Sequence, residues 1–118
     1  MGLKVEVKIT VGSEGSIPHT GTLESEDDGD EMFLSALIMD WSWESDLWDR
    51  INAECGTDLD EYEGVWIEST NLLIAARIIR EDLVADVGLP AEYVTFLLEA
   101  PDMLERCAHR HVRVMFSL

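Results

Sequence analysis

The sequence predicts an α+β fold: a small, mostly antiparallel sheet with three to four helices packed on one of its faces. Near both ends of the chain, apolar side chains alternate with polar ones, and this two-residue period is typical of half-buried strands. Between the ends, apolar residues recur every three to four positions, which is the period of an amphipathic helix. Since the chain has 118 residues and is 47% hydrophobic, we expect residues 1–118 to form a single globular domain.

Four short segments carry the strand signal. Leu3–Val11 alternates apolar residues with charged ones, and Val112–Leu118 closes the chain with the same period. Ile17–Leu23 is expected to return from a turn as a second strand, and Pro18 restricts it to an edge position or to the strand's start. Gly64–Ile67 is a short apolar run that favours a buried strand. We expect the first and last of these segments to belong to one sheet.

The first helical region is expected to start directly at the end of an acidic loop. Residues 24–31 hold six acids in eight positions and lead into an apolar stripe that ends at Cys55. Gly56 is a suitable residue to terminate the stripe. Ser42 and Ser45 interrupt it, so the pattern allows either one bent helix or two consecutive helices.

Two further helices are expected in the second half of the chain. Ser69 or Thr70 is a good N-cap for a helix over Thr70–Val87, which we expect to pack across the sheet. The last helix is expected to begin after Pro90. Pro101 should kink this helix or divide it, because proline removes a backbone hydrogen bond.

The negative charge is concentrated in one part of the chain. The net charge is −17. Residues 24–68 hold sixteen acids and a single arginine, which gives this segment a net charge of −15. Such a surface repels nucleic acid, so direct nucleic-acid binding is not expected.

Other features restrict the location and the cofactors. The N-terminus has no continuous apolar stretch, so we expect neither a signal peptide nor a membrane anchor, and we expect a cytoplasmic protein. Cys55 and Cys107 are too few for a disulfide framework and are interpreted as reduced thiols. No glycine-rich phosphate loop or catalytic motif is present, so neither a cofactor nor an enzymatic activity is predicted.

Two places were weighed as metal sites. Cys107, His109 and His111 are spaced by two, and on a strand their side chains would point the same way, as three zinc ligands would. The helical pattern still runs through Cys107, however, and a helix would splay the three. The acidic loop has EF-hand-like spacing, but Ser35 stands where the required glutamate would be, which favours a solvated acidic loop.

A cluster of tryptophans among acids is the strongest candidate for a binding surface. Trp41 and Trp48 belong to the apolar stripe, whereas Trp43 lies off it and is a candidate for exposure. An exposed tryptophan surrounded by carboxylates is typical of a binding hot spot for a basic protein. The predicted partner-binding surface combines Trp43 with acids from three parts of segment 24–68: Asp27, Asp28 and Asp30; Asp40, Glu44, Asp46 and Asp49; Asp60 and Glu61.

These features favour a protein-binding inhibitor as the function. The expected partner is a basic protein, such as a nuclease or a nucleic-acid-modifying toxin, neutralised as immunity proteins, antitoxins or nucleic-acid mimics do. This is an analogy of physical properties, because no motif assigns the chain to such a family. Two alternatives remain open: a small metal-binding protein or enzyme that uses the Cys107–His111 cluster or the acidic loop, and a homo-oligomeric (for instance dimeric) structural subunit.

Overall fold

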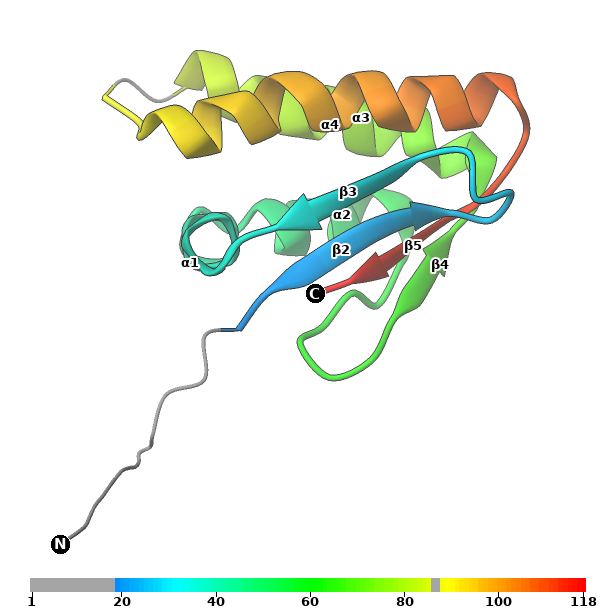
Figure 1. Ribbon diagram of the computed structural model, residues 1–118, viewed down its shortest axis with the longest axis horizontal. Helices are drawn as coiled ribbons and strands as arrows, with labels where there is room; N and C mark the ends of the chain where they lie inside the picture. Colours follow the sequence, from blue (N-terminus) through cyan, green and yellow to red (C-terminus); the bar gives the residue numbers. More distant parts are fainter. Residues whose placement is uncertain (1–18, 86–87) are drawn as a thin grey trace, which may run out of the picture.

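The described residues form a four-stranded sheet and four helices, which confirms the predicted α+β class (Figure 1). The computed structural model describes residues 19–85 and 88–118, so the strand predicted over Leu3–Val11 lies outside the described residues. The elements in chain order are β2 (Gly21–Ser25), β3 (Glu31–Leu34), α1 (Ala36–Glu44), α2 (Leu47–Cys55), β4 (Val65–Ile67), α3 (Ser69–Ala85), α4 (Ala91–His109) and β5 (Val114–Ser117).

The sheet is antiparallel throughout, with the strand order β3-β2-β5-β4. The last strand of the chain therefore lies in the middle of the sheet. There β5 pairs with β2 through Leu23 and Phe116 and with β4 through Ile67 and Val114. The strands predicted over Gly64–Ile67 and Val112–Leu118 are found as β4 and β5, and the one predicted over Ile17–Leu23 is found over Gly21–Ser25.

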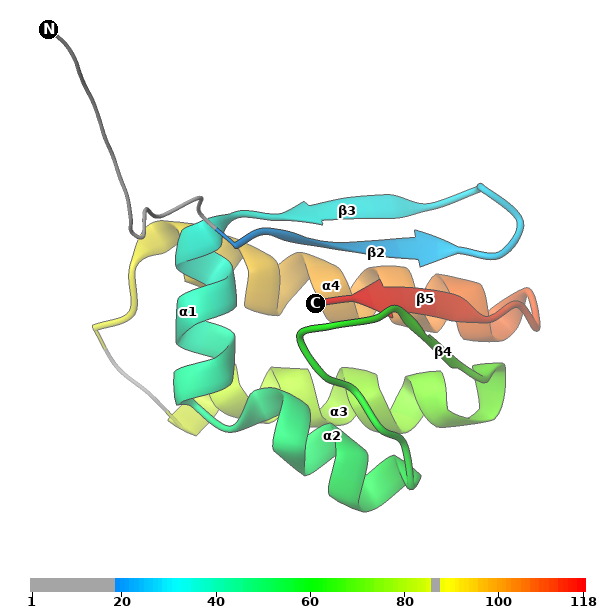
Figure 2. The ribbon, with the colours of Figure 1, turned by 90° about the horizontal axis from the view of Figure 1, so that it is seen from below.

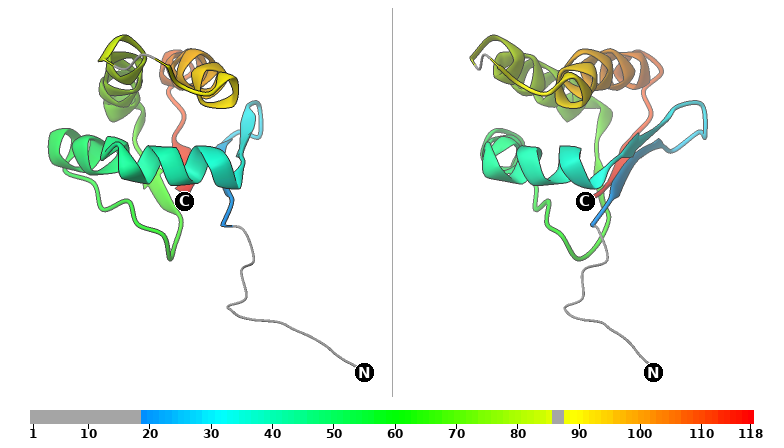
Figure 3. Two further views of the ribbon diagram at one scale, coloured as in Figure 1. Left: turned by 90° about the vertical axis from the view of Figure 1, so that its left-hand side faces the viewer. Right: turned by 60° about the vertical axis from the view of Figure 1, so that its left-hand side comes forward.

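All four helices lie on one face of the sheet (Figure 3). Alternate strand residues, among them Leu23, Val114 and Phe116, are fully buried beneath the helices. Trp48 of α2 meets both Phe116 of the sheet and Phe96 of α4 edge-on, with ring centroids 6.0 and 6.2 Å apart. This aromatic contact joins three elements in one core.

The segment expected to begin the first helix forms strand β3 instead. A four-residue turn follows Ser25, whose backbone N–H donates to the carbonyl of Asp30 at 2.9 Å. The chain then returns along β2, with Leu34 inside and Glu31 and Phe33 exposed. The prediction was wrong because Leu34 fits both periods: it is an inward strand residue and also continues the apolar stripe of α1.

Residues 36–55 form two helices, which decides between the two arrangements that the sequence allowed. Ser35 caps α1, and its hydroxyl accepts a hydrogen bond from the N–H of Ile38 at 3.3 Å. Between α1 and α2 the backbone of Asp46 turns to a left-handed conformation with φ of 61°. Gly56 terminates α2 with φ of 67°, as its position in the sequence predicts.

Pro101 lies inside a continuous helix, so of the two expected outcomes, a kink or a division, the division does not occur. The side chain is buried on the face of α4 that also buries Ala100 and Leu104. Burial of that face against the core offsets the lost hydrogen bond, which costs about 3 kcal/mol in an isolated helix. In the part of the chain that the structure describes, no helix combines the length and apolar character needed to cross a bilayer.

Candidate functional site

The acidic turn after β2 is neutralised within the molecule. Arg110, at the end of α4, bonds Asp27 at 2.9 Å and Asp30 at 2.8 Å. Arg106 reaches Asp30 at 2.8 Å. The guanidinium of Arg110 holds the pKa of Asp27 well below its ordinary range, and that of Arg106 lowers the pKa of Asp30. Two residues of the predicted partner surface, Asp27 and Asp30, are therefore used inside the chain, whereas Asp28 points to solvent at the tip of the turn.

All six arginines of the chain carry such partners. Arg113 bonds Glu26 at 2.7 Å, and Arg80 bonds Asp102 at 3.0 Å. The remaining pairs include Arg77–Glu54, Arg77–Glu81, Arg80–Glu105 and Arg50–Asp82. Within residues 19–85 and 88–118, no cationic side chain of lysine or arginine is left without a carboxylate.

A second group of acids has no such neutralisation. It covers α1, α2 and the segment 56–64 that leads from α2 to β4, which lie on the same side of the molecule (Figure 2). None of these acids forms an ion pair with another described residue, and the single arginine nearby, Arg50, is bound to Asp82. We call this group the acidic surface; it consists of Asp40, Glu44, Asp46, Asp49, Asp58, Asp60, Glu61 and Glu63.

Trp43 is half-buried and packs against the core. Its indole N–H is buried and has no hydrogen-bond acceptor among the residues described. Trp41 is also half-buried and packs against Tyr93 with ring centroids 6.1 Å apart and the ring planes tilted by 32°, while Trp48 is completely buried. Because most of the Trp43 side chain already serves the core, it offers a partner only a small area.

Tyr62 is the aromatic side chain that the acidic surface does present. It is 89% exposed and stands between Glu61 and Glu63. Tyr62 is not part of the partner surface predicted from the sequence, because the denser group of tryptophans is the more conspicuous aromatic signal. A signal was available: an aromatic residue in an acidic stretch without helical or strand period has no apolar stripe to join.

The segment that carries Tyr62 is fixed to the body of the protein. Asn52 of α2 donates to the carbonyl of Leu59 at 3.1 Å and accepts from its N–H at 2.7 Å. The Leu59 side chain is 4% exposed and inserts into the core. Asp60 accepts from the backbone N–H groups of Tyr62 and Glu63 at 2.8 and 3.1 Å. Tyr62 is therefore presented on an ordered turn, beside a hollow of ≈ 210 Å³ that it lines together with His19 and Leu118, among others.

The buried carboxylate of Asp82 connects this side of the molecule to the core. It forms an ion pair with Arg50 of α2 and accepts a hydrogen bond from the hydroxyl of Tyr93 of α4 at 3.1 Å. The Tyr93 oxygen also lies 3.2 Å from the hydroxyl of Ser45, between α1 and α2. Burial raises the pKa of Tyr93 to about 12, so its proton stays on and is donated to Asp82.

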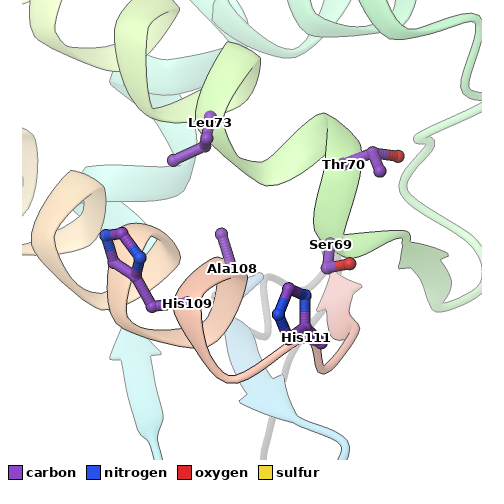
Figure 4. Close-up of a pocket in the computed structure, with 6 residues that line it drawn as sticks. All are labelled: Ser69, Thr70, Leu73, Ala108, His109 and His111. Atoms are coloured by element: carbon purple, nitrogen blue, oxygen red, sulfur yellow. The ribbon is translucent and has the colours of Figure 1, made fainter.

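The structure does not bring the three candidate zinc ligands together, residues that the sequence analysis did not favour as a metal site. Cys107 is buried in α4, and its sulfur lies 3.8 Å from the carboxylate of Asp30. His109 and His111 are exposed and line a hollow of ≈ 290 Å³ beside the start of α3 (Figure 4). The helix continues through His109 and splays the side chains, and burial raises the pKa of the Cys107 thiol. Among the described residues, no three His, Cys, Asp or Glu side chains are grouped so as to hold a metal ion.

Comparison with known proteins gives no further guide to the site. No protein-family model matches the chain, and searches of curated proteins and of solved structures find no significant match. The function therefore has to be inferred from the charges and contacts of the molecule itself.

Proposed function

We propose that the protein is an acidic inhibitor that binds and neutralises a basic protein, such as a nuclease or a nucleic-acid-modifying toxin. One observation carries the proposal. Eight carboxylates of the acidic surface have no ion-pair partner among the described residues, whereas every arginine of the chain is already paired. A surface with this one-sided charge is complementary to a site that binds phosphates.

The charge explains how such a protein would find its partner quickly. Carboxylates that occupy the positions of phosphates raise the association rate, to about 10⁸ M⁻¹s⁻¹ or more at low salt. Tyr62 adds an exposed aromatic side chain, between Glu61 and Glu63, to the charge of the surface. Tyrosine is enriched among binding hot spots, and a turn that is ordered before binding loses little entropy when the complex forms.

The proposed role includes a cytoplasmic location and no catalytic reaction. Both cysteines are free thiols, with Cys107 buried and Cys55 half-buried, as is usual in a reducing compartment. The partner is inferred to be basic, and no cofactor is assigned.

Charge reversal tests the proposal. The partner is captured from the native host at low salt, and its binding kinetics are compared for the wild type and for Glu44→Lys/Asp46→Lys. The double variant should associate at least about tenfold more slowly and with a flatter salt dependence. The matched control is Glu92→Lys/Glu99→Lys, which changes the charge equally on exposed positions of α4 and should bind like the wild type.

Tyr62→Ala tests the aromatic contact separately. It should leave the association rate unchanged and raise the dissociation rate, with a loss of about 2 kcal/mol in binding free energy. The fold should be unaffected because the side chain is 89% exposed. Salt-independent binding, or binding that neither variant changes, would show that the acidic surface serves only solubility.

A further inference from the structure

The outer edge of the sheet is hollowed between β3 and α4, the helix that lies nearer to β3 than α3 does (Figure 2). Two hollows of ≈ 280 and ≈ 250 Å³ are both lined by Met32 of β3 and Glu99 of α4, so they form one groove. Along α4 the lining extends from Glu92 to Arg106, and Arg106 at its far end is bound to Asp30. At roughly 1.5 Å per residue this stretch is about 21 Å long, enough for about six residues of extended chain.

The groove has an apolar floor and an acidic rim. Phe96 and Met103 of α4 are buried in its floor. Its rim carries the exposed carboxylates of Glu31, Glu92 and Glu99, none of which forms an ion pair with another described residue. Two of these three carboxylates belong to the helix, so most of the unpaired charge lies on the side of the groove that faces α4.

The backbone of β3 is available for pairing along this groove. β3 is the outermost strand of the sheet, and no described strand lies beyond it. An edge strand presents N–H and C=O groups that an added strand can bind. Met32 is paired with the buried Leu23 and therefore faces the helices, whereas Phe33 points to the open face of the sheet and is 64% exposed. Alternate residues of an added strand would lie beside Met32 and beside Phe33.

We propose that the groove binds an extended segment of a second protein, in which a basic, an apolar and another basic residue occupy alternate positions facing α4. Glu92 and Glu99 are seven residues apart on the helix, a distance of about 10 Å. The first and fifth residues of a strand are about 13 Å apart, and the long side chains of lysine or arginine cover the difference. Their aliphatic parts lie on the groove floor and their cationic ends reach the two carboxylates. The apolar residue between them lies beside Phe96, which lines the groove between Glu92 and Glu99.

This groove is separate from the acidic surface. No residue of the acidic surface lines either hollow. Segment 56–64 leads into β4, which is the opposite outer strand of the sheet from β3. The segment bound in the groove is therefore additional to the basic protein of the proposed function, and each interaction can be tested without the other.

A synthetic peptide tests the pattern. The peptide Ser-Arg-Thr-Val-Thr-Arg-Ser, with blocked ends, is titrated into the isotope-labelled full-length protein at about 0.15 M NaCl. We expect nuclear Overhauser contacts from the valine of the peptide to Met32 and Phe96. The control peptide with serine in place of valine keeps the charge and should bind about tenfold more weakly, because it loses the apolar contact. Equal binding of the two peptides would show that charge alone attracts them and would overturn the proposal.

Charge reversal on the protein tests the rim. Glu92→Lys/Glu99→Lys should weaken binding of the valine peptide by about tenfold or more, since two ion pairs are lost and two repulsions are added. Glu44→Lys/Asp46→Lys changes the net charge equally on the acidic surface and should bind this peptide like the wild type. An equal loss in both variants would indicate attraction to the net charge and would refute the groove. The same two variants should have the reverse effects on the basic protein of the proposed function, so either proposal can fail while the other stands.

The protein without peptide distinguishes the other occupants. Nuclear Overhauser contacts from residues 1–18 to Met32 or Phe96 would identify the chain itself as the occupant of the groove. Contacts that appear only between differently labelled molecules would identify a second copy. Either result would overturn the proposal, whereas the proposal expects neither before the peptide is added.

Discussion

Three helices, α2, α3 and α4, meet at the side chain of Asp82. This carboxylate is 6% exposed and accepts hydrogen bonds from Arg50 and Tyr93. A buried charge is tolerated only where such partners compensate its lost hydration. Because Ser45 joins the same network through Tyr93, Asp82 also fixes the junction of α1 and α2, where much of the acidic surface lies.

Two substitutions separate the parts of this network. Asp82→Ala leaves the Arg50 charge and the Tyr93 hydroxyl without their partner and should lower the free energy of unfolding by about 2–3 kcal/mol, less than for a fully buried pair because Arg50 is half-exposed. Tyr93→Phe removes one hydroxyl and should cost about 1 kcal/mol. Urea denaturation measures both. Equal losses would show that the hydroxyl, and not the ion pair, holds the helices together.

At the scale of elements, the turn between β2 and β3 is fastened to the end of α4. Arg106 and Arg110 come from the helix, and Asp27 and Asp30 come from the turn. These ion pairs join segments that are 76 to 83 residues apart in the sequence. They therefore hold the N-terminal hairpin of the described sheet against the C-terminal helix, in addition to the packing of the core.

The lowered pKa values of these aspartates predict a specific pH dependence. A carboxyl group whose pKa is lower in the folded state stabilises the fold above its unfolded pKa, here near the ordinary value of 3.8, and loses this contribution as the pH falls through the folded value. Asp27→Asn/Asp30→Asn should therefore be less stable than the wild type at pH 7. The difference should shrink steadily as the pH falls from about 5 to about 2.

Denaturation series at several pH values measure this difference. Asp28→Asn is the matched control, because Asp28 lies in the same turn and forms no ion pair with a described residue. Its difference from the wild type should vary little over the same range. A constant difference for the double variant would mean that the aspartates act through neutral hydrogen bonds alone.

The molecule as a whole carries a net charge of −17. Because ion pairs form in some parts of the molecule and not in others, the unpaired carboxylates are concentrated in one region. Arginines neutralise the turn after β2 and the outer sides of α3 and α4. The carboxylates of the acidic surface over α1, α2 and segment 56–64 are not neutralised, so they repel one another. Such repulsion destabilises the compact state and is screened by salt.

The free energy of unfolding should consequently increase with ionic strength. The proposed binding to a basic partner should instead weaken. Between about 0.01 and 0.15 M NaCl the Debye length falls from about 30 to 8 Å, and the melting temperature should rise. Asp40→Lys/Glu44→Lys, at two exposed helical positions of α1, should be more stable than the wild type at low salt, with a difference that shrinks at higher salt. Thermal melting measures both effects. A melting temperature independent of salt would show that the exposed acids are too far apart to repel each other.

Much of the fold could be predicted from the sequence because its elements have clear local signals. β5, β4, α3 and the end of α2 at Gly56 are where periodicity and a terminating residue indicate them. β3 could not be recognised because its inward residues merge with the helical stripe that follows. That Pro101 does not divide α4 could not be read from the sequence for a related reason: the cost of a proline is local, whereas the burial that offsets it comes from contacts with other elements.

The candidate site, too, could be predicted from the sequence only in part. The sequence by itself determined the α+β class, the strongly negative charge and the segment that carries it, because these depend on composition and on neighbours along the chain. The tertiary structure alone decided which carboxylates stay unpaired, since arginines from α4 reach Asp27 and Asp30 across about 80 residues of sequence. It also decided that Trp43 packs on the core while Tyr62 faces solvent. Exposure and ion pairing depend on distances in space, and these exist only once the helices have packed on the sheet.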